Sequence, residues 1–561
     1  MVQKLKVEKS VERLLSRDDV RLSRDQVNHY LNTGQWGVKS FVDYLEQHAE
    51  SNPNKVAITD ENGKKTTYSQ LHHQTEQFAL TLLELGIQPE DRIALQLPNC
   101  SELVISLMGA AKASILPVFC HMPYIEHDLD YVIGLTEAKA IVIPDSFNNK
   151  NYIDMIRSVQ EKHPCLKHII VVSDKEYEGT INFYDLLQKE IKSPSSKLEE
   201  VRPVGTDPFF IMFTSGTTGK PKAVYHLHAN NLFYIETLNE QLSIPKNGKM
   251  LAVPPLAHLT GLAFGVLTTL HRGGSVVLLS SWNVKKAVDL IENEKPTHFL
   301  GVTPMLIDLA RYEGLETRDI SSLKNIIYAG APCPAEILNI YTKKYNCEII
   351  AFYGYSEAGL THGTRAGDDV AITSTSFGKA AKGIEAKIVD EFGTELQAPC
   401  EGEVVVRGAN FIPGYYRQPQ NNTKAFDAEG WFHSSDIVRM DENGYCTFLA
   451  RKDDLINRGG YKIDPREIEE TLYGHPMISQ IAVIAMPDER LGERIAAFVI
   501  LKDNSKELSL ADITAYLSEK GLNKKNWPEA VRIVDSFPMT ASGKIQRFAM
   551  REQAKELKLA K

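Results

Sequence analysis

Short apolar runs that alternate with helical patterns are the strongest constraint on the fold of this 561-residue chain. Many of the runs are rich in valine and isoleucine at successive positions, which is typical of parallel strands covered by helices on both faces. The runs are residues 92–97, 140–144, 168–172, 209–213, 249–253, 275–279, 297–302, 325–330 and 348–354. Strands that alternate with helices in this way predict an α/β fold.

The length of the chain exceeds what one ordinary hydrophobic core can hold, so we expect two or more domains. Residues 1–36 are polar and helix-like and predict a surface extension. A large domain at 37–450 changes, towards its end, to short strands with glycine and acidic turns, which predicts a small β-rich section. Residues 451–465 have the charge and glycine content of a linker, and 466–561 predict a compact domain of strands and helices.

Composition argues against several classes of protein. A net charge of -9 argues against a wide nucleic-acid-binding face, so we expect no nucleic acid partner. The N-terminus lacks an apolar core between its charges, which argues against a signal peptide. The most apolar long stretch, 102–119, contains Glu102 and Lys112 and predicts a buried helix that runs into a strand, not a membrane span. Seven cysteines without a CxxC pair argue against a disulfide framework or a zinc site and favour a cytoplasmic location.

The stretch 214–224, TSGTTGKPKAV, has the composition of a phosphate-binding loop. Its hydroxyls can donate to phosphoryl oxygens, its glycines allow close approach of the backbone, and Lys220 adds a positive charge. It does not match the P-loop pattern G-x-x-x-x-G-K-[ST], because Thr214 replaces the first glycine and Pro221 replaces the magnesium-binding hydroxyl. The alternative is an ordinary polar turn. The predicted phosphate-binding residues are Thr214, Ser215, Gly216, Thr217, Thr218, Gly219 and Lys220.

Residues 214–222 resemble the signature of the acyl-adenylate-forming, or AMP-binding, superfamily, which includes acyl-CoA synthetases, adenylation domains of peptide synthetases and beetle luciferases. Further segments that resemble its motifs follow in the expected order: YAGA at 328–331, YGYSE at 353–357, WFHSSD at 431–436, RKDD with GGYK and PREIE within 451–469, and PMTASGK at 538–544. The chain departs from these motifs at Ser356, where threonine is usual, and at Ser434 and Ser435, which stand for Thr-Gly. The change at 356 keeps the hydroxyl, whereas the change at 435 bears on the local backbone shape.

The resemblance extends from about Val38 to about Arg551 and implies a particular division of the α/β fold. It implies a large N-terminal domain of two α/β subdomains and a small β-barrel-like subdomain. A small, mobile α+β domain is implied to follow and to close over the site.

The resemblance also implies a reaction in which a carboxylate attacks the α-phosphorus of ATP and expels pyrophosphate. Because carboxylate and phosphate repel each other, the site must supply positive charge and fixed donors. Lys544 is the implied catalytic cation, Glu357 is the implied ligand of Mg²⁺, and Ser356 is implied to donate to the α-phosphate. Asp436 is implied to accept both ribose hydroxyls, with Arg451 as its support. The alternatives are a surface glutamate at 357 and a turn aspartate at 436.

The adenine of ATP is implied to lie flat on Tyr353, next to Gly354, Gly330 and Ala331. The alternative for Tyr353 is a core tyrosine within a strand. The implied cofactors are ATP, Mg²⁺ and CoA, or the phosphopantetheine arm of a carrier protein in place of CoA.

The small domain is implied to rotate about a hinge at Asp453 after adenylation and to present a second face for thioester formation. Gly459 and Gly460 form a flat backbone stretch that would let a pantetheine arm approach. Arg458 and Lys462 could meet its phosphates. The alternative is an ordinary charged linker.

The stretch 254–265, PPLAHLTGLAFG, corresponds to the segment that lines the acid pocket in the superfamily. Relatives that activate amino acids place an aspartate here, because a buried ammonium without a partner is costly. This stretch has no acidic residue, which argues against an α-amino acid. His258 is implied to lie near the substrate carboxylate, and the alternative is a core histidine with satisfied hydrogen bonds. The other predicted pocket residues are apolar or aromatic: Leu259, Leu262, Phe264, Val302, Met305, Tyr355 and Leu360.

The leading hypothesis is an AMP-forming acid:CoA ligase for an apolar, medium-chain fatty, alicyclic or aryl acid. The AHLTG segment, LPN at 97–99 and residues 137–147 are similar to medium-chain fatty-acyl-CoA and alicyclic-acid-CoA ligases. The closest rival is an acyl- or aryl-AMP ligase, of the 2,3-dihydroxybenzoate-AMP ligase type, that loads a separate carrier protein. Such ligases usually carry Asn-Tyr after the histidine, where this chain has Leu259 and Thr260.

Two further alternatives are a luciferase-like oxygenase and a nucleotide-binding protein without catalytic activity. The presence of Lys544, Glu357 and Asp436 argues against the second of these. We expect a monomer or a homodimer without a transmembrane segment.

Overall fold

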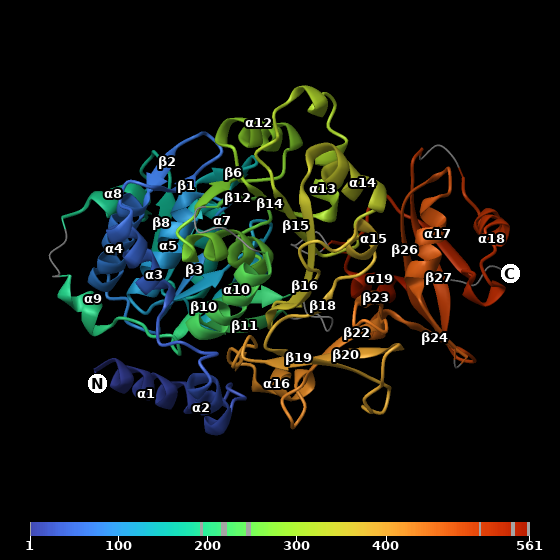
Figure 1. The fold of residues 1–561 in the computed structure, drawn as a ribbon, viewed down its shortest axis with the longest axis horizontal. Helices are drawn as coiled ribbons and strands as arrows, with labels where there is room; N and C mark the ends of the chain where they lie inside the picture. The colour runs from blue at the N-terminus through green and yellow to red at the C-terminus, as the bar shows by residue number, and fades with distance from the viewer. Residues whose placement is uncertain are drawn as a thin grey trace. The chain divides into compact units, whose positions relative to one another are not determined.

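The computed structural model describes residues 2–190, 195–214, 221–242, 248–459, 461–503, 507–539 and 545–557 (Figure 1). The chain forms two compact units. The first comprises Met1–Thr214, Pro221–Ala386 and Val406–Phe432. The second includes Lys387–Val405 and His433–Lys561, and so takes in part of the β-rich section that the sequence assigned to the large domain.

One sheet of the first unit has eight strands. In spatial order they are β21 (Gly414–Tyr415), β11 (Lys222–Leu227), β10 (Pro208–Thr214), β4 (Leu116–Phe119), β3 (Arg92–Leu95), β5 (Ala140–Pro144), β8 (His168–Val172) and β9 (Ile181–Asn182). All pairs from β10 to β9 are parallel, as expected for strands joined by helical crossovers. Strand β11 is antiparallel to β10 and to β21, so a segment from far along the chain lies beside the strand that follows the predicted phosphate loop.

The other sheet of the first unit has nine strands. In spatial order they are β18 (Lys379–Ala380), β17 (Gly359–Gly363), β16 (Glu348–Tyr355), β15 (Asn325–Ala329), β14 (His298–Val302), β12 (Lys249–Ala252), β13 (Ser275–Leu278), β1 (Val56–Thr59) and β2 (Lys65–Thr67). The pairs from β16 to β1 are parallel. Each apolar run predicted as a strand is a strand of one of these two sheets, which confirms the α/β prediction.

Helices flank both sheets of the first unit (Figure 1). They are α1 (Val2–Leu15), α2 (Arg24–Asn32), α3 (Phe41–Ser51), α4 (Tyr68–Glu84), α5 (Ser101–Lys112), α6 (Glu126–Thr136), α7 (Ile153–Lys162), α8 (Phe183–Gln188), α9 (Ser196–Glu200), α10 (His228–Leu242), α11 (Thr268–His271), α12 (Val284–Glu294), α13 (Thr303–Ala310), α14 (Ala335–Asn339), α15 (Val370–Thr373) and α16 (Pro419–Ala425), with π-helical segments at Thr260–Leu267 and Ile340–Lys344. The structure also has a small hairpin of β6 (Ser146–Phe147) and β7 (Lys150–Asn151).

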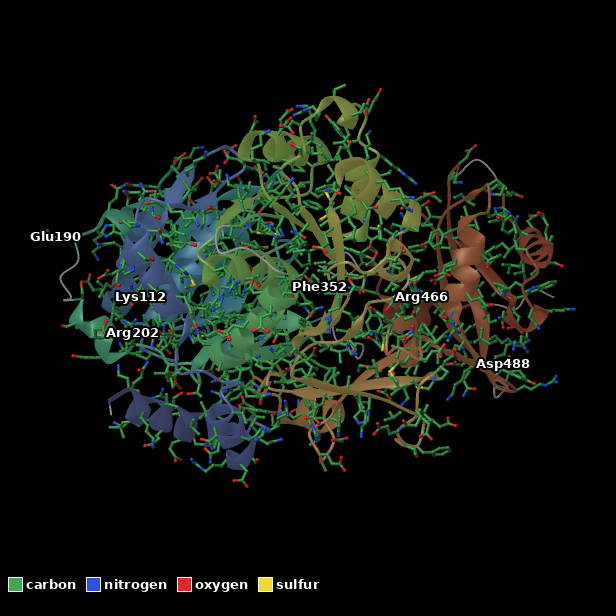
Figure 2. All side chains as sticks on the ribbon, in the orientation of Figure 1. Lys112, Glu190, Arg202, Phe352, Arg466 and Asp488 are labelled. Atoms are coloured by element: carbon green, nitrogen blue, oxygen red, sulfur yellow. The ribbon has the colours of Figure 1, made fainter. Side chains whose placement is uncertain are left out.

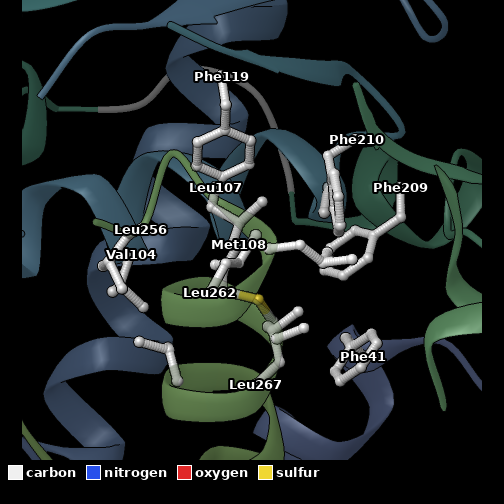
Figure 3. Packing of buried hydrophobic residues seen from close by; sticks show 14 of the residues in the cluster. Phe41, Val104, Leu107, Met108, Phe119, Phe209, Phe210, Leu256, Leu262 and Leu267 are labelled. Atoms are coloured by element: carbon white, nitrogen blue, oxygen red, sulfur yellow. The ribbon is translucent and has the colours of Figure 1, made fainter. Parts of the chain in front are cut away.

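The main core of the first unit lies where α5 meets the π-helix Thr260–Leu267. Figure 3 shows Leu107 and Met108 of α5 packed with Leu262 and Leu267 of that π-helix. Every residue of α5 is buried, and the helix runs into strand β4, as predicted. In the part of the chain that the structure describes, no helix has both the length and the apolar character that crossing a membrane requires.

The buried lysine of α5 belongs to a network of ion pairs. Lys112 contacts Glu46 at 3.0 Å, and Arg202 contacts Asp43 at 2.8 Å and also the carboxylate of Glu46 (Figure 2). Burial would favour a neutral lysine, but each ammonium or guanidinium here has a carboxylate partner. Of the two charges that argued against a membrane span, Lys112 therefore belongs to this network, whereas Glu102 accepts a hydrogen bond from the Tyr184 hydroxyl at 3.1 Å and contacts Lys64 at 3.7 Å.

The N-terminal helices pack into the first unit, unlike the surface extension that the polar composition predicted. Val7, Val11 and Leu14 are buried at helical spacing along α1. The Ser10 hydroxyl donates to Asp207 Oδ1 at 2.5 Å, which ties α1 to the segment before β10. The charged residues of α1 lie on its outer face, so its average composition concealed an amphipathic helix.

The second unit has two sheets. One consists of β19 (Ile384–Val389), β20 (Cys400–Gly408), β22 (Phe432–Met440) and β23 (Cys446–Arg451). The other consists of β25 (Tyr461–Ile463), β24 (Ile456–Arg458), β27 (Gly492–Leu501), β26 (Ile478–Asp488) and β28 (Ala530–Ile533), with helices α17 (Pro465–Tyr473), α18 (Leu510–Glu519) and α19 (Arg547–Ala554). Strand β26 directs Val483 into one small core and Ile484 into another, so the mixed strands and helices predicted for this part are confirmed.

Candidate active site

The predicted phosphate loop connects the antiparallel strands β10 and β11, and residues of the first unit hold its exit. Thr214 is the last residue of β10. The Pro221 carbonyl accepts hydrogen bonds from the Tyr131 hydroxyl at 2.9 Å and from the Gln418 side-chain amide at 3.3 Å. Residues 215–220 lie outside the described residues, so their predicted roles stay predictions.

Strands β16 and β17 form a tight hairpin whose turn carries the predicted metal and phosphate ligands. Tyr355 pairs with Gly359, so that Ser356 and Glu357 lie in the turn. Gly354 has no room for a side chain, because a Cβ there would lie 1.7 Å from the carbonyl oxygen of Gly359. Gly359 has a φ of +64°, a left-handed conformation that favours glycine. The two glycines thus set the conformation of the turn.

Glu357 is a buried carboxylate whose hydrogen-bond donor is neutral. The residue is 9% exposed, and its Oε1 accepts a hydrogen bond from the Tyr415 hydroxyl at 2.8 Å. Burial raises the pKa of Tyr415 well above its usual value, so the phenol keeps its proton. No lysine or arginine among the described residues forms an ion pair with Glu357. Because a buried carboxylate without a cation is costly, this arrangement suits a metal ion.

The predicted adenine-side residues lie at the carboxyl ends of adjacent parallel strands. Gly330 follows β15 and Tyr353 lies near the end of β16, while Val302, predicted for the acid pocket, ends the neighbouring strand β14. Open α/β sheets bind ligands at this edge. Gly330 has a φ of +96°, and no described atom lies within 4 Å of where its Cβ would be. Next to it, the Ala331 carbonyl accepts a hydrogen bond from the Thr303 hydroxyl at 2.6 Å, so open space borders this backbone.

Tyr353 is half-buried and already has an aromatic neighbour. Its ring stacks on Phe377 with 4.1 Å between centroids and an interplanar angle of 22°. Its hydroxyl lies 2.6 Å from that of Tyr355. One face of the Tyr353 ring is therefore covered by Phe377.

Most of the predicted acid-pocket side chains lie in the main core of the first unit. The fully buried ones are Leu259, Leu262, Phe264 and Leu360. Tyr355 packs against the same core. Met305 packs instead against the core on the other face of the nine-stranded sheet, because Phe299 and Leu300 of β14 face opposite sides. Val302 shares the face of Leu300 by strand alternation, whereas Met305 packs against the core on the opposite face.

His258 is half-buried just before the π-helix. Its Nδ1 accepts a hydrogen bond from the Thr260 backbone N–H at 3.2 Å. In the neutral imidazole the proton is then on Nε2, which makes Nε2 a donor. The π-helix passes close to the preceding segment, since a Cβ on Gly261 would lie 2.2 Å from the Pro254 carbonyl oxygen. Such π-helical turns are frequent at functional sites.

In the second unit, the predicted ribose ligands are cross-strand neighbours. Asp436 of β22 pairs with Arg451 of β23, and Arg451 Nε lies 2.8 Å from Asp436 Oδ1. Asp436 is 2% exposed, whereas Arg451 is exposed. The structure therefore brings these two residues together as the resemblance implied.

The turn before Asp436 has an unusual backbone. Ser435, which stands where glycine was expected, has a φ of +60°. This left-handed conformation is uncommon for residues other than glycine. The Ser435 N–H donates to Glu403 Oε1 at 3.0 Å, and Glu403 Oε2 accepts from Lys452 at 3.0 Å. A buried glutamate thus supports the turn that places Asp436.

The predicted hinge residue Asp453 lies in a 3-10 turn, Lys452–Asp454. Its backbone carbonyl accepts a hydrogen bond from Arg551 of α19, which also contacts Asp454 at 3.2 Å. The hinge segment is therefore attached to the last described helix of the second unit.

The two side chains predicted to contact CoA phosphates, Arg458 and Lys462, form ion pairs with carboxylates. Arg458 Nη2 lies 2.7 Å from Glu529 Oε1, and Lys462 Nζ lies 2.9 Å from Glu391 Oε2. Each cation therefore already has a carboxylate partner. The Gly459 N–H donates to the Leu491 carbonyl at 2.7 Å, with φ +59° at Gly459. Gly460 and the predicted catalytic Lys544 lie outside the described part of the chain.

Three residues at these positions were not predicted from the sequence: Tyr415, Phe377 and Glu403. Each contacts a predicted residue from a distant part of the chain, as Tyr415 contacts Glu357 from 58 residues away. No local pattern marks such partners, since Tyr415 lies in an ordinary Pro-Gly-Tyr-Tyr turn.

The sequence profile of the AMP-binding enzyme family matches residues 45–416, and that of the AMP-binding enzyme C-terminal domain matches 467–544. The chain is 34% identical to the medium-chain fatty-acid–CoA ligase of Escherichia coli (strain K12), covering 93% of this chain and 92% of that protein. It is 32% identical to the 2,3-dihydroxybenzoate-AMP ligase of Bacillus subtilis (strain 168), covering 95% and 96%.

Two solved structures are similar over nearly the whole chain. ATP-bound MatB from Rhodopseudomonas palustris aligns with a TM-score of 0.79 and 26% identity over 92% of this chain and 99% of that one. The anthranilate CoA ligase AuaEII in complex with anthranoyl-AMP aligns with a TM-score of 0.80 and 25% identity over 92% and 98%.

Proposed function

Because the chain belongs to the AMP-binding enzyme family, we propose that it is an ATP-dependent, AMP-forming acid:CoA ligase. The first step joins a carboxylic acid to the α-phosphorus of ATP and releases pyrophosphate. The second step transfers the acyl group from AMP to the thiol of CoA. The observation that carries this proposal is Glu357, a buried carboxylate with a neutral donor at the turn of the β16–β17 hairpin.

The residues of the first unit suit the phosphate chemistry of the first step. Glu357 would hold Mg²⁺, and the bound ion would neutralise charge on the phosphoryl oxygens. Ser356, its neighbour in the same turn, would donate to the α-phosphate. The loop that ends at Pro221 would hold the leaving pyrophosphate through backbone and hydroxyl donors.

The residues of the second unit suit the nucleoside and the reacting groups. Asp436 would accept both ribose hydroxyls, and Arg451 neutralises its charge without using all of its acceptor capacity. Lys544 would contact the acid carboxylate and the phosphoryl oxygen in the transition state. Arg458 and Lys462, which are paired with Glu529 and Glu391, are weaker candidates for CoA phosphate ligands.

We propose an apolar, medium-chain fatty acid as the substrate class. The predicted pocket side chains in the main core are aliphatic or aromatic, and no acidic residue occurs in 254–265 to pair with an ammonium. The similarity to the medium-chain fatty-acid–CoA ligase of Escherichia coli supports this class. His258, with Nε2 as a donor, would orient the carboxylate.

The similarity to the 2,3-dihydroxybenzoate-AMP ligase of Bacillus subtilis supports a second candidate function, that of an acyl- or aryl-AMP ligase. In that case the acyl group would go to the phosphopantetheine arm of a separate carrier protein. Leu259 and Thr260 stand where aryl-acid ligases usually have Asn-Tyr, which favours CoA over a carrier protein as the acceptor of the acyl group. A cytoplasmic location and a monomeric or homodimeric state remain predictions.

The test is acid-dependent release of pyrophosphate from ATP and Mg²⁺, measured with fatty, alicyclic and aryl acids, with and without CoA. We expect release with medium-chain fatty acids and formation of a thioester only when CoA is present. Accumulation of acyl-AMP without a thioester would favour the carrier-protein rival. No release with any acid would refute the proposal.

A further inference from the structure

We propose that Tyr415 is a positioning residue for the metal-binding carboxylate, and that the N-terminal segment 17–21 keeps Tyr415 in place. The inference rests on the proposed function in one respect, namely that Glu357 is the metal ligand. Residues 17–21 precede the part of the chain that the AMP-binding profile matches, which begins at residue 45. The inference therefore assigns a role in the reaction to a segment outside the part of the chain that this profile matches.

The hydroxyl of Tyr415 sets which oxygen of Glu357 faces the site. It donates to Oε1 at 2.8 Å, and the backbone carbonyl of Glu357 accepts from the Ile412 N–H at 2.9 Å. The segment before Tyr415 thus holds both the backbone and the side chain of the glutamate. A carboxylate with one oxygen engaged in this way presents the other to a cation in a defined direction.

Strand β21 is only two residues long, so its place in the sheet depends on its neighbours. The Tyr415 N–H donates to Asn422 Oδ1 at 3.0 Å. On the other side, the Tyr416 N–H donates to the carbonyl of Ala223, just after the phosphate loop, at 2.9 Å. One short segment therefore contacts both the metal ligand and the exit of the phosphate loop.

The N-terminal segment covers this short strand through Asp19. Asp19 is 2% exposed; its carbonyl accepts from the Asn422 side-chain amide at 2.8 Å, and its Oδ2 accepts from the Arg417 N–H at 2.6 Å. The contact is close, because a Cβ on Gly414 would lie 1.9 Å from the carbonyl oxygen of Asp19. Glycine at 414 is thus what allows the N-terminal segment to approach β21.

Arg21 and Arg17 flank Asp19 and make the remaining contacts of the N-terminal segment. The Arg21 N–H donates to the Pro413 carbonyl at 2.8 Å, and its guanidinium lies 3.7 Å from the centre of the Phe426 ring. Arg17 pairs with Asp19 at 2.7 Å. Loss of the contacts between segment 17–21 and β21 would weaken the attachment of this strand and allow Tyr415 to move away from Glu357.

The first test removes one atom, with Tyr415→Phe in the full-length protein. We measure binding of α,β-methylene-ATP, which cannot transfer its adenylyl group to an acid, by calorimetry with Mg²⁺ and with EDTA. We expect Tyr415→Phe to reduce the Mg²⁺-dependent gain in affinity by roughly 10- to 100-fold, as outer-sphere changes at metal sites do. Affinity in EDTA should not change, since the lost hydroxyl acts only through Glu357.

The matched control is Tyr225→Phe. Tyr225 is a buried tyrosine on β11, beside β21, and its hydroxyl has no hydrogen-bond partner in the described part of the chain. Its removal should leave both affinities at the wild-type values. Unchanged Mg²⁺ dependence in Tyr415→Phe, or an equal loss in Tyr225→Phe, would overturn the role of Tyr415.

The second test displaces the N-terminal segment 17–21 from β21 by the substitution Gly414→Ala. The added Cβ must displace Asp19, so we expect the same selective loss of the Mg²⁺-dependent gain as in Tyr415→Phe, with a lower melting temperature. Gly37→Ala is the control, since no described atom lies within 4 Å of a Cβ at that position. Wild-type Mg²⁺ dependence in Gly414→Ala would overturn the role of the N-terminal segment.

The inference and the proposed function fail in different ways. If Tyr415→Phe loses the Mg²⁺-dependent gain in affinity but the wild-type protein releases no pyrophosphate with any acid, the proposed function fails and the role of Tyr415 stands. If pyrophosphate is released and Tyr415→Phe keeps the wild-type Mg²⁺ dependence, the inference fails alone.

Discussion

Glu357 and Asp436 are both buried carboxylates at predicted ATP-binding positions, but their partners differ in charge. Glu357 accepts a hydrogen bond from the neutral hydroxyl of Tyr415, whereas Asp436 lies 2.8 Å from the guanidinium of Arg451. Glu357 lies in a hairpin turn of the first unit, and Asp436 lies in a paired strand of the second.

The charge of the partner determines which kind of ligand each carboxylate can bind. The negative charge of Glu357 lacks a protein cation among the described residues, so a metal ion would complete it. The charge of Asp436 is already balanced by Arg451, so Asp436 is suited to neutral hydroxyl donors such as those of a ribose. Two carboxylates that are similarly buried are therefore suited to different ligands, a metal ion at Glu357 and hydroxyl groups at Asp436.

The largest expected effect comes from removing the uncompensated charge. Glu357→Gln keeps the shape of the side chain and a hydrogen-bond acceptor for Tyr415 but loses the charge for Mg²⁺. We expect acid-dependent pyrophosphate release to fall roughly 10²- to 10³-fold, as for loss of one transition-state contact. Far-ultraviolet circular dichroism should be unchanged, and a rate within about threefold of wild type would contradict the assignment.

Acid should destabilise the unit that carries Glu357 because that unit buries neutral histidines. Burial lowers the pKa of His228 and of His362 to about 3, below the usual 6.5. Between pH 6.5 and 3 the unfolded chain therefore binds protons that the folded chain does not, and stability falls as the pH falls. We expect a loss of roughly 1.4 kcal/mol per pH unit for each histidine in urea unfolding.

The window from pH 6.5 to 5 isolates this effect, because unperturbed carboxylates titrate below it. His226, whose pKa burial also lowers to about 3, contributes in the same direction. A free energy of unfolding that stays constant between pH 6.5 and 5 would show that the buried neutral histidines do not control stability.

Asp436→Asn should have a smaller effect than Glu357→Gln, and of a different kind. It leaves the side-chain shape but weakens two hydrogen bonds to ribose, so we expect the KM for ATP to rise by about tenfold. The concentration of Mg²⁺ for half-maximal rate should stay at the wild-type value. An increase in that Mg²⁺ concentration would remove the distinction between the two carboxylates.

The smallest expected effect concerns the turn that places Asp436. Ser435 has a φ of +60°, so Ser435→Val should lower the free energy of unfolding by about 1–2 kcal/mol. Ser435→Gly should change it by less than about 1 kcal/mol, since relief of strain offsets the greater freedom of the unfolded chain. Equal thermal unfolding of the valine and glycine variants would argue against strain at this turn.

Much of the fold could be predicted because its signals are local. Runs rich in valine and isoleucine predicted β3, β5, β8, β10 and β12 to β16, and the charges within 102–119 argued for a buried helix rather than a membrane span. The N-terminal helices were misjudged, because their charges hid the helical spacing of Val7, Val11 and Leu14.

The site could be predicted only as a set of residue types. Glu357, Asp436 and Arg451 were named from their motifs, and the structure pairs Asp436 with Arg451 across two strands. Met305 packs against a different core from Leu259 and Leu262, because α13 covers the opposite face of the sheet, and no local pattern in the sequence indicates which face a helix covers.

The sequence by itself determined the alternation of strands and helices, the order of the motifs and the kinds of groups available for the reaction. These properties follow from side-chain volume, polarity and spacing along the chain. Only the tertiary structure decided that Tyr415 donates to Glu357, that Glu403 supports Ser435 and that Asp19 covers β21. Such contacts depend on distances of about 3 Å between segments far apart in the chain, which packing sets and composition does not.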